Sequence, residues 1–90
     1  MISWGFAFGY SDLVTLGVNF PKPSCYIYVG GATGDIVYLN ATGQAQFFPN
    51  AQGNNIYPIA ATQIVSSATV NGTYRATTAT NLVYCSTGIP

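Results

Sequence analysis

Short apolar segments with a two-residue period recur along the chain, and clusters of turn residues separate them. In SCYIYVG (24–30), Tyr26 and Tyr28 point to one side of a strand and the apolar residues between them point to the other. No window of twelve residues has the 3.6-residue period of an amphipathic helix. The pattern predicts an all-β fold: a small antiparallel β-sandwich, or a jelly-roll-like barrel, of seven or eight short strands.

Turn residues set the limits of these strands. Asn71-Gly72 is the strongest local feature, because both residues accept the positive φ of a two-residue type I′ hairpin turn. Pro49 is expected to end a strand, since it has no N–H for the ladder. Residues 30–34 are expected to form a loop or hairpin turn. The expected strands cover residues 13–20, 24–30, 35–40, 44–48, 55–59, 62–70, 73–80 and 81–85.

The first ten residues, MISWGFAFGY, alternate large and small side chains. As a strand they form an aromatic comb, defined by Trp4, Phe6, Phe8 and Tyr10. Ten extended residues span roughly 33 Å, as long as the body of a domain of this size. The comb can lie in a sheet of its own domain, or it can leave as an arm on a neighbouring subunit. We favour the arm, because burying each ring is worth about 2 to 3 kcal/mol and a small core is thin.

The domain organisation follows from this interpretation. We expect a single domain in which residues 1–23 form the extended arm and the first strand, and residues 24–90 form the β-sandwich. The sequence contains no boundary, repeat of useful period or low-complexity tail.

Charge is nearly absent from the chain. Only 4% of the residues are charged, the two basic and two acidic side chains cancel, and there is no histidine. A molecule without net charge does not repel its copies, and too few charges remain to guard the sheet edges. Composition therefore predicts a protein covered by neighbours, as a homo-oligomer. Two separated cations cannot neutralise a phosphate backbone, which argues against nucleic-acid binding.

The apolar N-terminus also bears on targeting. It lacks a basic region and a continuous apolar run, because Asp12 interrupts it, so a signal peptide or transmembrane helix fits poorly. A membrane-active N-terminus is a weaker hypothesis, since interfacial helices carry a basic face that this segment lacks. We therefore expect no membrane partner.

The chain contains few of the residue types that support catalysis. Asp12 and Asp35 are the only carboxylate side chains, and no histidine can activate a serine or cysteine. We expect the two carboxylates to cap backbone N–H groups in loops. Cys25 and Cys85 cannot form a zinc site alone; they either form a disulfide or stay free as buried thiols, which we favour. The sequence predicts no enzyme, no cofactor and no metal.

The pair Phe47-Phe48 interrupts the alternation of its strand. One ring points outward, or a bulge redirects it, so that the pair either contributes to an interface or is covered by the loop after Pro49. The triplets Asn40-Ala41-Thr42 and Asn71-Gly72-Thr73 match the N-glycosylation pattern and serve equally well as turns. The candidate interface residues are therefore Trp4, Phe6, Phe8, Tyr10, Phe47 and Phe48.

A longer pattern covers residues 24–85. An apolar strand enters a Gly30-Gly31 turn, an aromatic strand passes through a glycine loop into Tyr57-Pro58-Ile59, and a Thr-Ala-Thr run (78–80) enters the last apolar strand. With this order the chain resembles the small spike-base proteins of tailed bacteriophages and gene transfer agents. It departs from them by lacking basic residues just after the Tyr-Pro-Ile strand and by a longer hairpin at 70–75.

The resemblance implies a function in assembly. We expect a virion structural protein, a capsid decoration (cement) or spike-base subunit on the outer capsid surface, assembled in the host cytoplasm. Its partners would be the major capsid protein, sister subunits in a trimer or pentamer, and a fibre or spike protein. The alternative is a secreted or surface-displayed β-sandwich that binds carbohydrate through exposed aromatic rings, with Cys25 and Cys85 oxidised.

Overall fold

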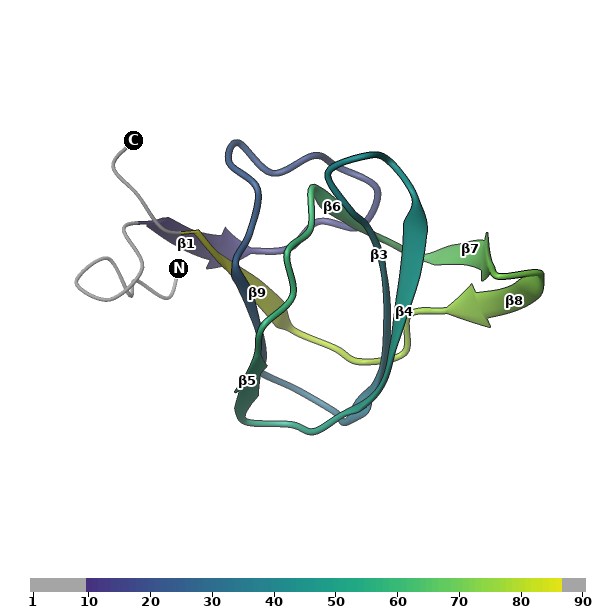
Figure 1. Ribbon diagram of the computed structural model, residues 1–90. Coiled ribbons are helices and arrows are strands. Elements are labelled where there is room, and N and C mark those ends of the chain that lie inside the picture. Colours follow the sequence, from purple (N-terminus) through teal and green to yellow (C-terminus); the bar gives the residue numbers. More distant parts are fainter. Residues whose placement is uncertain (1–9, 87–90) are drawn as a thin grey trace.

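The computed structural model describes residues 10–86 of the chain, and all regular structure in this range is β (Figure 1). The nine strands form antiparallel pairs only, which confirms the predicted all-β, sandwich-like fold. They are β1 (Tyr10–Leu13), β2 (Tyr26–Val29), β3 (Gly34–Leu39), β4 (Ala45–Ala51), β5 (Asn55–Tyr57), β6 (Gln63–Val65), β7 (Ser67–Val70), β8 (Thr73–Ala76) and β9 (Leu82–Ser86).

The strands are divided between two sheets and a hairpin. Sheet A has the order β1-β9-β2-β5, and sheet B has the order β4-β3-β6. Strands β7 and β8 pair only with each other among the described strands, and their hairpin projects beyond sheet B (Figure 1). Strand order in sheet A brings the two ends of the described chain together, because β1 pairs with β9 along its whole length.

The core lies between sheets A and B. Sheet A contributes alternate residues of β2 and β9, and sheet B contributes Ile36 and Ile64, both without exposed surface. The ring of Phe20 closes one side by stacking on Tyr84, with centroids 4.2 Å apart and planes 9° from parallel. Each fully buried aliphatic side chain contributes about 1.5 to 3 kcal/mol. The core cluster consists of Phe20, Ile27, Val29, Ile36, Ala51, Ile59, Ala61, Ile64, Ala79, Leu82 and Tyr84.

Residues 14–20 form a loop, so the strand expected over 13–20 was wrong. The loop bonds first to one sheet and then to the other: the Val14 N–H donates to Leu82 O at 2.8 Å, and the Gly17 N–H donates to Ile64 O at 2.8 Å. Gly17 has a φ of 78°, which redirects the chain between these two bonds. The segment therefore joins the edges of the two sheets.

Pro49 does not end its strand as expected, because β4 continues to Ala51. Strand β4 is an edge of sheet B, where a residue without an N–H is tolerated. The register passes from Ile36–Phe48 to Gly34–Ala51, which places an extra residue in β4 as a bulge. Asn50 lies in this bulge with a φ of 55°.

Two expected strands are shorter than their sequence patterns suggested. The strand expected over 62–70 divides at Ser66 into β6, which joins sheet B, and β7, which joins the hairpin. The strand expected over 73–80 ends at Ala76. In contrast, the two-residue turn is confirmed: Val70 pairs with Thr73, and Asn71 and Gly72 have φ values of 50° and 82°.

Residues 77–81 connect the hairpin to β9 through side-chain hydroxyls. Thr77, Thr78 and Thr80 accept hydrogen bonds from the N–H groups of Val37, Asp35 and Ala32, at 2.9, 2.8 and 2.7 Å respectively. The Gly31 N–H donates to Thr80 O at 3.0 Å. We call residues 77–81, together with the 30–37 backbone that they contact, the threonine seam. Its hydroxyls accept from backbone N–H groups at and before the end of the β3–β6 pairing, which stops at Val37.

Candidate functional site

One row of paired residues crosses all four strands of sheet A. From β5 to β1 the row is Ile56, Tyr28, Val83 and Leu13. Directly paired residues of antiparallel strands share a face, and their neighbour Tyr84 points into the core, so this row faces away from the core. Ile56 and Leu13 at the two ends of the row are 40% and 54% exposed, whereas Val83 has no exposed surface.

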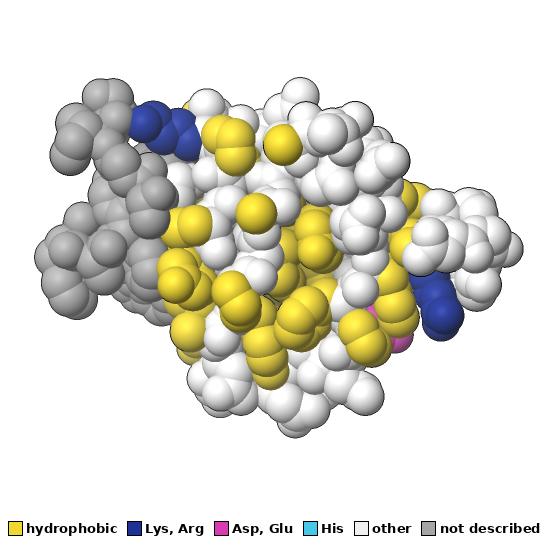
Figure 2. All heavy atoms as spheres, viewed as in Figure 1, with side chains coloured by type: hydrophobic (Ala, Val, Ile, Leu, Met, Phe, Trp, Pro, Cys, Tyr) yellow, Lys and Arg dark blue, Asp and Glu magenta, His cyan; other side chains and the backbone are white. Residues whose placement is uncertain are grey.

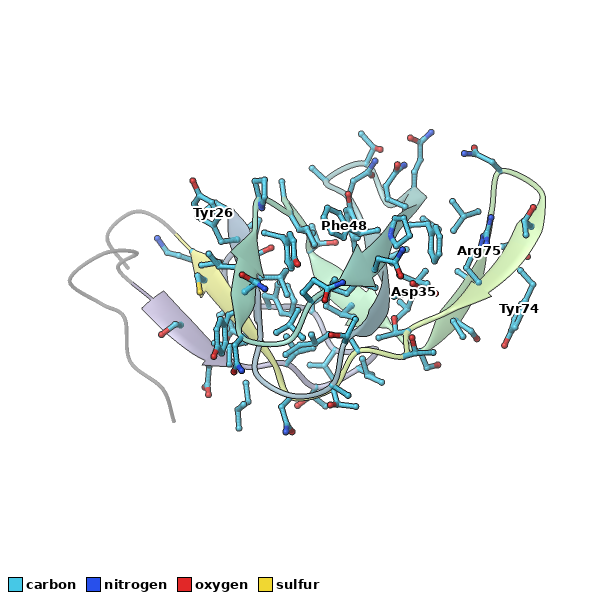
Figure 3. All side chains as sticks on the ribbon, turned by 90° about the horizontal axis from the view of Figure 1, so that it is seen from below. Tyr26, Asp35, Phe48, Tyr74 and Arg75 are labelled. Carbon is cyan, nitrogen blue, oxygen red and sulfur yellow. The ribbon has the colours of Figure 1, made fainter. Side chains whose placement is uncertain are left out.

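A second row lies beside the first on the same face. It runs from Tyr26 on β2 through Cys85 on β9 to Ser11 on β1. Cys85 is fully buried and Ser11 is 5% exposed, although both face away from the core. Figure 3 shows Tyr26 at the outside of the molecule, whereas Phe48 lies between the sheets. We call the two rows together the outer face; they contain no charged side chain.

A second apolar surface belongs to the 14–20 loop and the residue before it. Leu13, Leu16 and Val18 are 54%, 47% and 53% exposed, and we call them the loop patch. Beside them lies a groove of about 310 Å³, lined by Leu13, Val14 and Leu16 on one side and by residues 79–82 on the other. Exposed apolar clusters of this kind mark contact sites more often than isolated exposed residues do.

The β7–β8 hairpin carries the most exposed large apolar side chain of the described residues. Tyr74 is 70% exposed, and Figure 3 shows it directed away from the body. The next residue, Arg75, turns back and lies 4.4 Å from the centroid of the Phe47 ring on β4. Val70, which pairs with Thr73 beside the turn and lies on the same face of the hairpin as Arg75, is 8% exposed. One face of the hairpin therefore packs against the rest of the protein, and the other face, which carries Tyr74, is exposed.

Phe47 and Phe48, two predicted interface residues, lie on opposite faces of β4. Phe48 pairs with the core residue Ile36, and its ring is 4.9 Å from that of Tyr57 at an angle of 54°. Phe47 faces the hairpin under Arg75. Both side chains are half-buried by contacts within the chain. Their role in an interface stays a prediction.

The aromatic comb falls almost entirely on residues that the structure does not describe. Trp4, Phe6 and Phe8 lie outside residues 10–86. Tyr10 is the first residue of β1, where its backbone pairs with Ser86 of β9. The segment that carries the comb therefore enters the fold at an edge strand of sheet A, directly beside the outer face.

The carboxylates cap backbone N–H groups, as expected, although they stand in strands and not in loops. Asp12 on β1 accepts from its neighbour Leu13 at 2.8 Å, and Asp35 on β3 accepts from Asn50 at 3.0 Å. The chain has two basic side chains, Lys22 and Arg75, and Figure 2 shows the basic side chains far apart, with apolar side chains gathered on the face between them.

Cys85 lies on β9, and Cys25 lies immediately before the neighbouring strand β2; both are free thiols. The Cys25 N–H donates to Cys85 O at 2.8 Å, and the Cys25 thiol donates to the same oxygen at 3.3 Å. Burial raises the pKa of Cys85 to about 11, and the nearby Cys25 thiol adds to the effect. A thiol with this pKa is a poor nucleophile at neutral pH.

The structure of residues 10–86 also bears on metal binding, on membrane insertion and on the turn at Asn40. Within this range, no group of three or more His, Cys, Asp or Glu side chains is placed to hold a metal ion. The same part of the chain contains no helix of the length and hydrophobicity needed to cross a membrane. Asn40 uses its side-chain oxygen within its own turn, where it accepts from Thr42 N and Gln44 N at 3.0 Å each.

Comparison with known proteins found no matching family model, no matching curated protein and no matching solved structure. The alternation in the sequence predicts that Tyr26 and Tyr28 share one side of a strand, but it does not predict the outer face. That face depends on which strands flank β2, and no local pattern specifies this.

Proposed function

We propose that the protein is a non-enzymatic virion structural protein. It acts as a capsid decoration, cement or spike-base subunit on the outer capsid surface, where it stabilises the shell or anchors a fibre. Its partners are the major capsid protein and its own copies, in a trimer or pentamer. The observation that carries this proposal is the combination of several exposed apolar surfaces with an almost uncharged exterior.

The apolar surfaces support assembly because they lie at separate places. The loop patch is at the edge of sheet A, whereas Tyr74 is on the projecting hairpin. A small-molecule site requires one concave pocket, whereas a subunit that contacts several neighbours requires several separate surfaces. With only 4% charged residues, neither copies nor capsid proteins are repelled at these surfaces.

The resemblance supplies the kind of assembly. Two parts of the motif that are far apart in sequence, Gly30-Gly31 and Thr78-Ala79-Thr80, meet in the threonine seam. An alanine Cβ at position 31 would contact the Thr80 hydroxyl, which requires glycine there. These two segments thus form one structural unit in this fold.

Two measurements test the proposal. Capsid particles purified from the organism that carries the gene should contain this chain in fixed ratio to the major capsid protein, as measured by quantitative mass spectrometry. The isolated protein should be a defined oligomer by light scattering, and Leu16→Lys with Val18→Lys should reduce it to monomer. Thr69→Lys, at an exposed hairpin position, is the matched control. Particles that lack the chain would contradict the proposal.

The alternative, a secreted or surface-displayed carbohydrate-binding β-sandwich, is favoured by one observation. Tyr74 is 70% exposed and free to stack on a sugar ring. Such a module should be a monomer, should carry a Cys25–Cys85 disulfide, and should lose glycan binding when Tyr74 is changed to Ala. The free thiols of the structure differ from that expectation.

A further inference from the structure

We propose that the outer edge of β8 pairs with the same edge of a second copy, about a two-fold axis at Tyr74, so that the two hairpins form one continuous antiparallel sheet. This inference concerns the isolated protein and does not depend on the proposed function. The observations that carry it are the exposure of β8, the direction of its backbone groups and the position of its single charge.

Strand β8 is the more exposed strand of the hairpin. Thr73, Tyr74 and Arg75 are exposed, whereas on β7 only Thr69 is exposed. Among residues 10–86, β8 pairs only with β7, and the hairpin projects beyond sheet B (Figure 1). A two-stranded ribbon is marginally stable, and further strands add to its stability. The outer edge of β8 is therefore the edge of the hairpin at which another strand can be added.

The backbone groups of Tyr74 point outward from the hairpin. Strands joined by a two-residue turn begin with a hydrogen-bonded pair, here Val70 with Thr73, and such pairs then alternate with pairs that are not hydrogen-bonded. The bond from Thr77 N to Ser66 O at 2.9 Å agrees with this alternation. Tyr74 belongs to a pair that is not hydrogen-bonded, so its N–H and C=O are directed to the outer edge, where they can bond to another strand.

The single charge of the hairpin selects the register. In an antiparallel copy, the outward groups of Tyr74 can meet those of Tyr74 or those of Ala76. In the Ala76 register, Arg75 would lie directly opposite Arg75 of the second copy, and like charges in that position are destabilising. In the Tyr74 register, each Arg75 lies opposite Thr73, which is uncharged. Charge therefore favours the two-fold axis at Tyr74.

The same register also pairs the exposed rings. Directly opposite residues share a face, so the two Tyr74 side chains, each 70% exposed in the single chain, would lie side by side. Contact between aromatic rings adds to the stability that comes from their burial. Arg75 extends from the opposite face, where it contacts Phe47. A second copy therefore completes the edge without changing the contacts that anchor the hairpin.

The contact is small, which sets the conditions for its measurement. The reciprocal hydrogen bonds of Tyr74 and one ring pair are far less than a standard interface of about 1,600 Å². We expect the pairing to be sparsely populated at micromolar concentration, where the loop-patch oligomer is measured. It should strengthen when copies are held close together, because their effective concentration is then higher.

Nuclear magnetic resonance of the isolated full-length protein tests the pairing. Between micromolar and millimolar concentration, the backbone amide shifts of residues 72–76 should change and saturate. A sample mixed from isotope-labelled and unlabelled chains should show a contact between the Hα atoms of Thr73 and Arg75 of different molecules, because these residues form a close pair that is not hydrogen-bonded. Tyr74→Lys should weaken the association several-fold by placing like charges opposite each other. The matched substitution Thr69→Lys, on β7, should leave it unchanged.

Each other outcome overturns the proposal. Amide shifts that stay constant up to millimolar concentration would show that the edges do not pair, and changes centred on residues 67–70 would assign the contact to β7. An intermolecular contact between the two Arg75 residues would exclude the axis at Tyr74. Equal association of Tyr74→Lys and Thr69→Lys would show that the edge of β8 is not involved. If Tyr74→Lys perturbs the hairpin in dilute solution, the intermolecular contact in the wild-type protein decides alone. Capsid particles that lack the chain would contradict the proposed function without affecting these results.

Discussion

The guanidinium carbon of Arg75 lies 4.4 Å from the centroid of the Phe47 ring, which joins the β7–β8 hairpin to sheet B. A two-stranded hairpin is marginally stable alone in water. This one is held by the Arg75–Phe47 contact, by burial of Val70 and by the hydrogen bond from Thr77 N to Ser66 O at 2.9 Å. Because Tyr74 projects from the same strand, the contact also fixes the orientation of the aromatic ring that is most exposed within residues 10–86.

The cation–π contact should be measurable in a double-mutant cycle. Arg75→Gln and Phe47→Leu should each lower the free energy of unfolding, and their coupling should be about 0.5 to 1 kcal/mol, as for exposed pairs of this type. Urea denaturation gives these values. Tyr74→Gln on the same strand should change stability by less than about 0.5 kcal/mol. A coupling near zero would mean that Arg75 does not hold the hairpin.

The threonine seam should depend on its hydroxyls. Thr77→Val removes the acceptor of the Val37 N–H at 2.9 Å and the donor to Val65 O at 2.7 Å, while side-chain volume is kept. Leaving a buried backbone group without its partner costs about 1 to 3 kcal/mol. Thr69→Val, at an exposed position of β7, should cost little. Equal midpoints of chemical denaturation for the two variants would contradict the role given to the seam.

Glycine at position 34 should be required by packing and not by backbone conformation. A Cβ there would meet the backbone N of Ala79, whereas a Cβ on Gly72 has nothing within 4 Å and would strain only the φ of 82°. Gly72→Ala should cost about 1 to 2 kcal/mol. Gly34→Ala should lower the free energy of unfolding by more. Overpacking alone costs up to about 3 kcal/mol, and the atom that the new Cβ meets belongs to the backbone, which cannot move aside as easily as a side chain. Thermal melts of the two variants would show the order, and a reversed order would count against the seam geometry.

Because the pKa of Cys85 is raised in the folded state, the free energy of unfolding should change with pH in the alkaline range. The folded state keeps the thiol protonated to about pH 11, whereas the unfolded chain loses the proton near the ordinary value of 9.0. Above the ordinary value the unfolded state binds fewer protons, so stability falls as the pH rises from 9.0 to about 11. The loss should reach about 2 kcal/mol, and it should be smaller in Cys85→Ala, which serves to subtract the titration of tyrosines.

Thiol reactivity offers an independent measurement of the same burial. At pH 8, Cys85 should react with iodoacetamide far more slowly than the half-exposed Cys25, and unfolding should equalise the two rates. Peptide mass spectrometry after timed alkylation distinguishes the two sites. Rapid modification of Cys85 in the folded protein would show that the outer face is open.

Sequence determined the local features of this protein. Alternation located the core of most strands, because a strand with one buried face needs a two-residue period. Asn71-Gly72 determined the hairpin turn, since few other residue pairs accept two consecutive positive φ values. The scarcity of charge is likewise a property of the sequence, and with it the prediction of association. Phe47 and Phe48 were recognised as unusual for the same local reason, the break in alternation.

Only the tertiary structure decided how these segments combine. The N–H groups of Val14 and Gly17 donate to different sheets. Residues 14–20 therefore form a loop, although their sequence pattern favours a strand. Ser66 divides one apolar segment between sheet B and the hairpin, and Pro49 is tolerated because β4 is an edge. The outer face exists because β9 lies between β1 and β2, with Val83 paired to both Leu13 and Tyr28. These outcomes depend on contacts between residues far apart in the chain, and local periodicity gives each strand two faces without stating which neighbours will cover them.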